Sequence, residues 1–199
     1  MKPRFSSIIE AVQALQKGQL IILVDDIHRE NEGDFVMAAE FATEKTINTM
    51  ITLGKGLVCA PISEAVAKQL DLPLMVKSNT ESFRTAFTIS VDAKTNTTGI
   101  SAKERADTLN QLANPKAKPD DFVRPGHIFP LIGKAGGVKA RPGHTEASLA
   151  LMQLAKLQPV AVICEIILAD GKMARREDLF VLASKLKMPI LDISQLLKP

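Results

Sequence analysis

The chain has 199 residues, a net charge of +3 and 46% hydrophobic residues. This length and apolar content predict one domain with a large core. The charge is mild and spread along the chain, which argues against a polyanion-binding surface. Trp and Tyr are absent, which argues against the aromatic platforms that bind single-stranded nucleic acid. We therefore expect no nucleic-acid partner.

Cysteine usage and the N-terminus indicate a cellular compartment. Cys59 and Cys164 both lie in apolar, strand-like runs, so we expect buried free thiols in a reducing cytoplasm. Met1-Lys2-Pro3-Arg4 leads into an amphipathic stretch without the long apolar region of a signal peptide. No apolar run is long enough to span a bilayer, so no membrane partner is expected.

The first half of the chain predicts alternating helices and strands. Ser7 and Glu10 form a capping-box pattern, and Ile8, Ile9, Val12 and Leu15 form one apolar face of the helix that follows. The elements expected here are a helix over 7–18, strands over 20–24 and 35–39, a helix over 43–54, a strand over 56–61, a helix over 63–70 and a half-buried strand over 85–92.

The second half begins with another capping-box pattern, Ser101 and Glu104. The tetrapeptide Arg-Pro-Gly-His occurs twice, at 124–127 and at 141–144. The expected elements are a helix over 101–112, a surface loop over 114–121, a short strand over 128–132, a helix over 145–157, a strand over 159–167, a helix over 175–187 and a strand over 189–193. Without strict βαβ alternation, this order predicts one α+β domain over 1–199, with a mixed sheet covered by helices.

An acidic loop is the most informative stretch. Five carboxylates fall within residues 25–34, between two buried strands. Crowded like charges need compensation, and a divalent cation supplies it. Oxygen ligands without a nearby Cys suit Mg²⁺ or Mn²⁺, and Arg29 can clamp a phosphate or a carboxylate. A solvated acidic turn is the alternative, but the tight flanking strands and the embedded Arg29 and Gly33 favour a site.

The second tetrapeptide stands at a predicted helix start. Free backbone N–H groups and the helix dipole make such a place an anion site, to which Arg141 and the Thr145 hydroxyl add donors. Ordinary capping, with Thr145 as the N-cap, is the alternative. His144, one of only three histidines, is a candidate metal ligand.

Two further residues have side chains suited to proton transfer. Glu165 lies in a continuous apolar run, where a carboxylate needs partners or takes a raised pKa, and such a Glu is a candidate general base. It would instead face solvent if it stood at the strand end. His127, in the first tetrapeptide, is a candidate acid/base partner or an ordinary turn histidine.

Four motifs follow one another along the chain and together carry a resemblance. They are Asp25-Asp26 followed by Arg29-Glu30-Asn31-Glu32-Gly33-Asp34, then Thr97-Thr98-Gly99-Ile100-Ser101, then Arg124-Pro125-Gly126-His127-Ile128-Phe129-Pro130-Leu131, and then Arg141-Pro142-Gly143-His144-Thr145-Glu146-Ala147. In this order they closely resemble the 3,4-dihydroxy-2-butanone 4-phosphate synthase family of riboflavin biosynthesis. The resemblance covers nearly the whole chain.

The resemblance implies a lyase that converts D-ribulose 5-phosphate into formate and L-3,4-dihydroxy-2-butanone 4-phosphate. It implies Mg²⁺ or Mn²⁺, two ions per site, and a homodimer with its sites near the interface. By motif position, Glu30 and His144 would hold the metal, and His127 and Glu165 would be essential for catalysis. Residues matching substrate-contact positions are Arg29, Glu30, Asp34, Cys59, Arg141, Pro142, Gly143, His144, Thr145 and Glu165, with Arg141 and Thr145 near the phosphate.

Two features differ from common family members. Ile27-His28 stands where the family usually carries acidic or polar residues; we favour a tolerated change over a new role for His28 as ligand or proton shuttle. No Cys-rich zinc pattern of a GTP cyclohydrolase II domain is found, so a monofunctional form is expected. A catalytically silent sugar-phosphate binder and an RNA-interacting module are the alternatives, and the intact Glu30, His127, His144 and Glu165 argue against the first of these.

Overall fold

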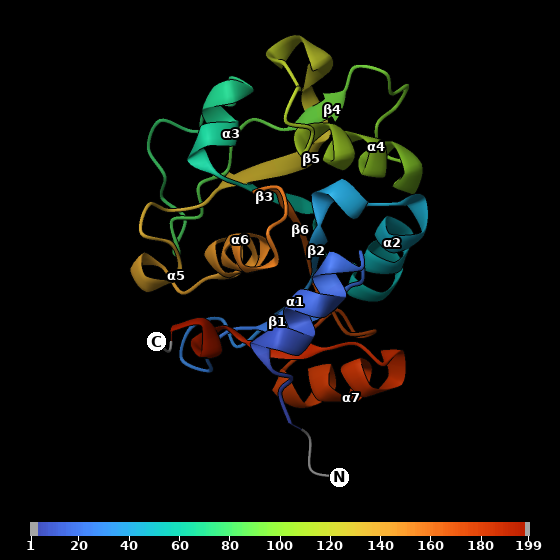
Figure 1. Ribbon diagram of the computed structural model, residues 1–199, viewed down its shortest axis with the longest axis vertical. Coiled ribbons are helices and arrows are strands. Elements are labelled where there is room, and N and C mark those ends of the chain that lie inside the picture. Colours follow the sequence, from blue (N-terminus) through green and yellow to red (C-terminus); the bar gives the residue numbers. More distant parts are fainter. Residues whose placement is uncertain (1–3, 198–199) are drawn as a thin grey trace.

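Seven strands pair into one mixed sheet with helices on both faces, in a computed structural model that describes residues 4–197 (Figure 1). This arrangement confirms the predicted α+β class. Residues 1–3, which carried part of the expectation about a signal peptide, lie outside the described residues. The strands are β1 (Ile21–Val24), β2 (Gly33–Ala38), β3 (Cys59–Ile62), β4 (Val91–Ala93), β5 (Phe122–Ile132), β6 (Ala161–Glu165) and β7 (Ile190–Asp192).

The strand order, β4-β5-β3-β6-β2-β1-β7, places the acidic loop beside β6. β1 and β2 form an antiparallel hairpin whose connection is the acidic loop. On its other side β2 pairs antiparallel with β6, and Asp34 is opposite Glu165. Two carboxylates far apart in the sequence therefore become neighbours.

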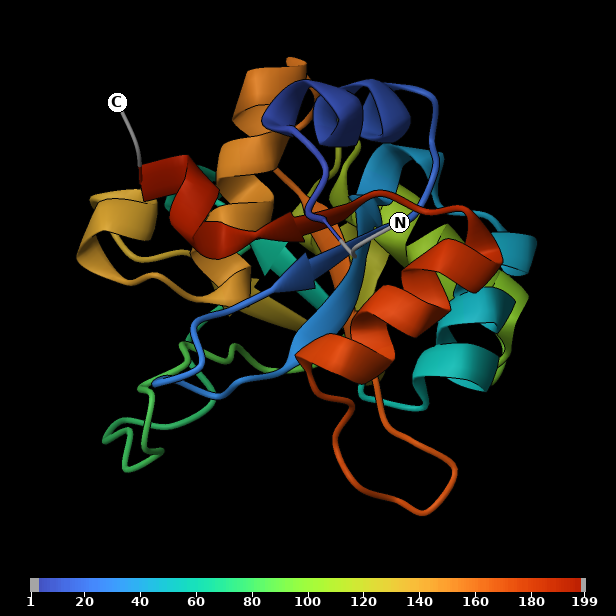
Figure 2. The ribbon, with the colours of Figure 1, turned by 90° about the horizontal axis from the view of Figure 1, so that it is seen from below.

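Helices cover both faces of the sheet. Those on one face are α1 (Ile8–Gln16) and α6 (His144–Ala155), and those on the other are α2 (Glu44–Thr49), α4 (Ala102–Leu112) and α7 (Arg176–Leu186) (Figures 1 and 2). The shorter elements are α3 (Glu64–Gln69), α5 (Gly137–Ala140), the π-helical turn η2 (Met50–Gly54) and the 3₁₀ turns η1 (Ala39–Phe41), η3 (Pro119–Asp121) and η4 (Ile193–Leu197).

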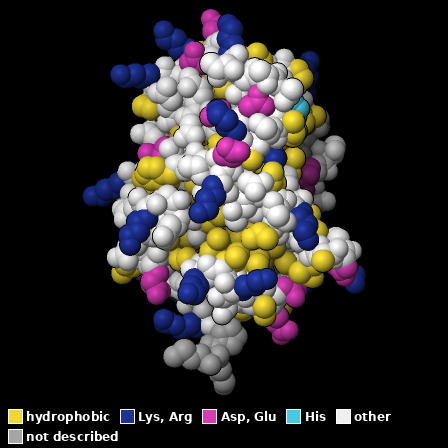
Figure 3. Space-filling view, turned by 90° about the vertical axis from the view of Figure 1, so that its right-hand side faces the viewer, with side chains coloured by type: hydrophobic (Ala, Val, Ile, Leu, Met, Phe, Trp, Pro, Cys, Tyr) yellow, Lys and Arg dark blue, Asp and Glu magenta, His cyan; other side chains and the backbone are white. Residues whose placement is uncertain are grey.

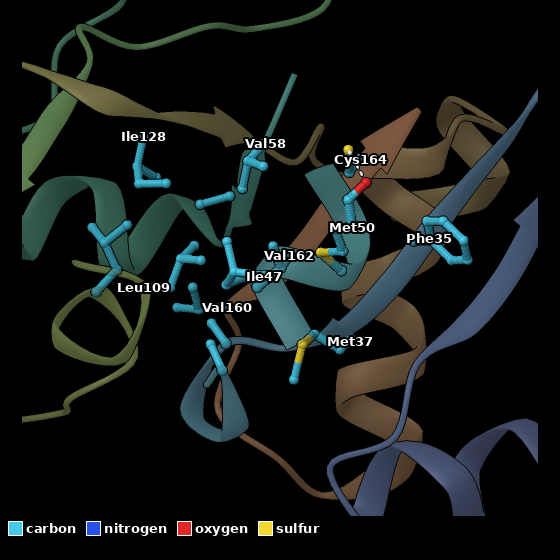
Figure 4. Packing of buried hydrophobic residues seen from close by; sticks show 14 of the residues in the cluster. Phe35, Met37, Ile47, Met50, Val58, Leu109, Ile128, Val160, Val162 and Cys164 are labelled. Carbon is cyan, nitrogen blue, oxygen red and sulfur yellow. Dashed lines mark hydrogen bonds between the residues drawn. The ribbon is translucent and has the colours of Figure 1, made fainter. Parts of the chain in front are cut away.

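The core accounts for the continuous apolar runs of the central strands. Every residue of β1 and β2 is buried, because helices pack on both faces of the sheet. On the α2 side Phe35, Met37, Ile47 and Met50 belong to one cluster (Figure 4). Cys164 joins this cluster and Cys59 the one on the opposite face, and both are buried free thiols, as predicted.

The first helix confirms its predicted start and, except for Ile9, its predicted apolar face. Ser7 is the N-cap of α1 and Glu10 completes the capping box. Ile9, however, is 68% exposed, whereas Ala11 and Ala14 are buried. Leu15 is also buried, and Ile8 and Val12 pack against the same cluster, so the prediction was wrong only for Ile9.

The strand predicted over 85–92 is much shorter in the structure, because β4 begins only at Val91. Backbone N–H groups before Val91 donate hydrogen bonds to carbonyls of two different segments of the chain. The Thr88 N–H donates to the Pro130 carbonyl, and the Ile89 N–H donates to the Pro73 carbonyl. The segment thus crosses between two parts of the chain and forms only isolated bridges.

The sequence predicted only a short strand over 128–132, after the first tetrapeptide. In the structure the tetrapeptide is itself part of the long strand β5. Val91 pairs with Ile128, yet the next residue, Asp92, pairs with Val123. The four residues between these partners, Arg124–His127, therefore form a bulge. Pro and Gly in this tetrapeptide are typical of a turn, so the sequence did not predict the bulge.

The surface carries mixed charge. Figure 3 shows Lys and Arg side chains interspersed with Asp and Glu on one face, and hydrophobic side chains gathered near its lower end. A groove of about 880 Å³ lies along α7, and its lining includes Phe180, Val181 and Met188. Among the described residues, no helix has the length and hydropathy needed to cross a membrane.

Glu104 organises the loop that precedes α4. Ser101 caps the helix by accepting from the Glu104 N–H at 3.1 Å, as predicted. The Glu104 carboxylate accepts from the hydroxyl and N–H of Thr97, the hydroxyl and N–H of Thr98, and the N–H of Gly99. These hydrogen bonds, those from Thr97 foremost, lower the pKa of Glu104 to about 2.

Replacing Glu104 by Gln should therefore destabilise the fold in a pH-dependent way. A lowered carboxyl pKa adds stability that is present above its usual value of 4.5 and disappears as the pH falls towards about 2. Urea unfolding of wild type and Glu104→Gln should differ at neutral pH and converge in acid. Glu177→Gln, also in the first turn of a helix, is the control. An equal difference at every pH would contradict this role.

Candidate active site

The acidic loop is folded around the buried carboxylate of Asp25, which is 0% exposed. Asp25 Oδ2 accepts from Arg29 Nη1 at 2.8 Å and from the Glu30 N–H at 3.1 Å. Asp25 Oδ1 accepts from the Glu32 N–H at 2.9 Å. The Asp25 side chain thus accepts hydrogen bonds from three groups of the loop and fixes the direction of Glu30. Sequence reasoning placed Asp25 in the acidic run but gave it no role.

Glu30 and His144 lie side by side, as predicted. Glu30 Oε2 is 3.8 Å from His144 Nδ1, and the side chain of His144 is 7% exposed. The His144 Nε2 atom is buried and has no hydrogen-bond partner among the described residues. Burial lowers the pKa of His144 to about 4, so the imidazole is neutral at physiological pH and offers a lone pair.

These groups fit a divalent cation. Asp25, Glu30 and His144 each offer a ligand atom within 4.8 Å of the others. Asp25 already accepts three hydrogen bonds, so Glu30 and His144, whose Nε2 has no partner among the described residues, are the better cation ligands. Burial raises the pKa of Glu30, and a bound cation would reverse that shift by favouring the carboxylate.

The start of α6 brings Arg141, Pro142, Gly143 and Thr145 next to this cluster. His144 is the first helical residue and Gly143 is the N-cap, so the alternative of Thr145 as the N-cap is wrong. Thr145 is buried, whereas Pro142 is exposed. The α6 N-terminus has no side-chain cap, which leaves backbone N–H groups there for an anion.

Two guanidinium groups converge on the N-cap position. A Cβ added to Gly143 would lie 2.6 Å from Arg141 Nη1 and 3.0 Å from Arg29 Nη2, so only glycine leaves both arginines in place. Arg29 also stacks 4.8 Å over the Phe83 ring. The positive charge of both side chains adds to that of the helix terminus.

Arg141 is more constrained than sequence reasoning indicated. Its Nη1 is 2.7 Å from the buried Glu146 Oε2, its Nε donates to the Phe83 carbonyl at 3.1 Å, and its Nη2 donates to Thr85 Oγ1 at 2.8 Å. It therefore holds residues 83–85 against the start of α6. Part of its donor capacity remains, since a guanidinium has five N–H groups.

Asp34, Glu165 and Cys59 lie near one another beside the loop. Glu165 is half-buried at the end of β6, and its Oε2 accepts from the Leu57 N–H at 2.8 Å. Burial, and then the nearby Glu165 charge, raise the pKa of Asp34 well above its usual range. Burial and the Glu165 charge likewise raise the pKa of the Cys59 thiol. Asp34 can thus carry a proton at a pH where an ordinary Asp cannot.

His127 lies in a second cluster. Its partner is Asp92, whose Oδ2 is 2.7 Å from His127 Nδ1. Among residues 4–197, no hydrogen bond or ion pair joins His127 to the cluster of Glu30 and His144. Sequence reasoning identified His127 but missed Asp92, which the alternating pattern assigned to the polar face of a strand.

Arg175 was also missed as a site residue. Its Nη1 donates to the Glu30 carbonyl at 2.7 Å and to the Asn31 carbonyl at 2.8 Å. Arg175, the N-cap of α7, thus holds the outer side of the acidic loop. Ile27 and His28, by contrast, are exposed at the tip of the loop, and Ile27 is 61% exposed.

Removing Arg175 should weaken divalent-cation binding without removing a ligand. Arg175→Ala frees the carbonyls of Glu30 and Asn31, so Glu30 loses its fixed direction, and loss of such supporting contacts lowers metal affinity by roughly 10–100-fold. Calorimetric titration with Mn²⁺ measures the effect. Lys172→Ala, which removes an exposed cation paired with Asp170, is the control. Equal affinities of the two variants would exclude the supporting role.

Comparison with known proteins places the chain in a family. The family model of 3,4-dihydroxy-2-butanone 4-phosphate synthase matches residues 9–198. The riboflavin biosynthesis protein RibBA of Bacillus cytotoxicus and that of Bacillus cereus are each 53% identical over 193 residues. Each match covers 97% of this chain and 49% of the relative, so the chain spans about half the length of these curated relatives.

Solved structures have the same fold. A 3,4-dihydroxy-2-butanone 4-phosphate synthase in complex with two magnesium ions is 40% identical with a TM-score of 0.94, covering 96% of this chain and 95% of that one. The two-domain synthase RibBX from A. baumannii is 48% identical with a TM-score of 0.93, covering 96% of this chain and 56% of that one. The chain belongs to the 3,4-dihydroxy-2-butanone 4-phosphate synthase family.

Proposed function

We propose that the chain converts D-ribulose 5-phosphate into formate and L-3,4-dihydroxy-2-butanone 4-phosphate, the four-carbon precursor of riboflavin. The observation that carries this proposal is the buried imidazole of His144 at the N-terminus of α6: its Nδ1 lies 3.8 Å from Glu30 Oε2, and its Nε2 has no hydrogen-bond partner among the described residues. A cation ligand set and an anion-binding helix start adjoin there. The cation site suits the vicinal oxygens of a phosphorylated sugar, and the helix start suits its phosphate.

The reaction needs an enediol, loss of the C1 hydroxyl as water, a carbon shift, addition of a water molecule and expulsion of C4 as formate, so that no water is gained or lost overall. A divalent cation held by Glu30 and His144 would supply Lewis-acid polarisation of the vicinal sugar oxygens. Glu165 would accept a proton as general base, and His127 would be its acid/base partner in catalysis. Asp34, with its raised pKa, would contact the substrate and donate a proton. Cys59 would line the floor of the pocket.

The phosphate would bind at the start of α6. Arg29, Arg141, Thr145 and the backbone around Pro142-Gly143 would fix it there, away from the reacting carbons. Binding energy gained at the phosphate would then position the sugar chain against Glu165 and the cation site.

We propose Mg²⁺ or Mn²⁺ as the cofactor, with two ions per site; the structural relative solved with two magnesium ions supports this number. We also propose a cytoplasmic homodimer with sites near the interface, and a single synthase domain over residues 1–199. Buried free thiols at Cys59 and Cys164 support the reducing compartment. Light scattering should give twice the 21.6 kDa chain mass.

Formate release from D-ribulose 5-phosphate with Mg²⁺ tests the proposed function. We expect formate in proportion to enzyme, its loss with EDTA, and its recovery when Mg²⁺ is added back. Glu165→Ala should bind the substrate but lose at least about 100-fold in kcat, the usual contribution of a general base. The control is Glu64→Ala, an exposed glutamate of α3.

One result would contradict this function, and two others would contradict the roles of the cation and of Glu165. Substrate binding without formate by the folded wild type would favour the catalytically silent sugar-phosphate binder instead. Formate release unaffected by EDTA would exclude the cation. Normal turnover by Glu165→Ala would remove Glu165 from the catalytic groups while leaving the reaction intact.

A further inference from the structure

The bulge in β5 aims His127 at a buried carboxylate. Residues Arg124–His127 have no pairing partner in β4 and fold over its start. The Gly126 N–H donates to Ser90 Oγ at 3.1 Å, and the His127 N–H donates to Asp92 Oδ1 at 2.9 Å. Bulges next to active sites commonly redirect one side chain, and here that side chain is His127.

Asp92 binds His127 through both carboxylate oxygens. Oδ1 accepts the backbone N–H, and Oδ2 is 2.7 Å from the ring Nδ1. An ionised carboxylate only accepts hydrogen bonds, so Nδ1 carries the proton. In a neutral imidazole the lone pair is then on Nε2. The Asp92 side chain is 7% exposed and that of His127 is 45% exposed, which leaves the Nε2 edge of the ring for a ligand.

The Thr97–Ser101 loop closes the opposite side of the pair. Gly99 has φ +81°, and a Cβ there would overlap Asp92 Oδ2 and lie 2.7 Å from His127 Nδ1. Glu104 fixes this loop through the N–H of Gly99 and the hydroxyls of its threonines. The ring of His127 is therefore held from two sides, by the carboxylate and by a loop with no side chain at the contact.

We infer that Asp92 is a positioning residue that holds His127 in the Nδ1–H tautomer and presents Nε2 as the atom that exchanges a proton with the sugar phosphate. This inference rests on the proposed function, in which His127 is a catalytic group. Asp92 itself does not touch the substrate. Its effect on turnover must pass through His127, which distinguishes it from a residue that only stabilises the fold.

The tautomer can be measured directly in the wild-type protein, with one substitution to assign the ring. The chain has three histidines, so ¹⁵N-imidazole spectra contain three rings, and His127→Gln identifies one of them. In the wild type, neutral His127 should carry its proton on Nδ1. In Asp92→Asn the amide can donate to Nδ1, so the proton should move to Nε2. Wild-type His127 with its proton on Nε2 would overturn the inference.

Kinetics test the same claim independently. Asp92→Asn should lower kcat by at least about 100-fold with little change in KM, as expected when a proton-transfer group is held in the wrong tautomer. Asp92→Asn combined with His127→Gln should be no slower than His127→Gln alone, because Asp92 acts through His127. Asp121→Asn, which loses a carboxylate that binds the Lys118 N–H, is the control.

The outcomes separate this inference from the proposed function. An inactive wild type with the Nδ1–H tautomer would reject the function and leave the geometry of the pair correct. An active wild type with unimpaired Asp92→Asn would reject the positioning role alone, and so would additive losses in the double variant. Circular dichroism of each variant confirms that the fold is retained.

Discussion

The hydrogen bonds of the Asp25 carboxylate are the interaction on which the site depends. A carboxylate at 0% exposure would be costly without partners, and Asp25 has a guanidinium and two backbone N–H groups. The chain that leaves β1 therefore turns back around Asp25 before it enters β2. Glu30 faces the start of α6 because of that turn, and the proposed cation site follows from it.

Sheet order and helix position supply the remaining groups. β6 lies beside β2, which puts Glu165 opposite Asp34, and α6 delivers His144 together with its uncapped N-terminus. The proposed cation ligands, proton-transfer groups and anion donors thus come from separate segments that converge at one end of the sheet. The Asp92–His127 pair belongs to a second cluster on β4 and β5. There the Asp92 carboxylate, together with the bulge of β5, sets the orientation of the imidazole.

Much of the fold and site could be predicted, because local signals were strong. The continuous apolar run of β1, the Ser7 cap and the pairing of Glu30 with His144 needed only sequence pattern and motif position. Other features depend on long-range contacts. Arg141 binds carbonyl and hydroxyl groups more than fifty residues away, and Arg175 binds Glu30 from a distant helix. The bulge that contains His127 depends on how β5 pairs with β4, which the turn-like composition of the tetrapeptide does not predict.

Mn²⁺ binding by Asp25→Asn, compared with Asp26→Asn, tests the central claim most directly. Both variants remove one negative charge from the same loop, but only Asp25 holds Arg29 and the backbone of Glu30. Asp26 is exposed and binds the His28 N–H. The account predicts at least about a tenfold loss of affinity for Asp25→Asn and little change for Asp26→Asn. Equal affinities of the two folded variants would contradict it.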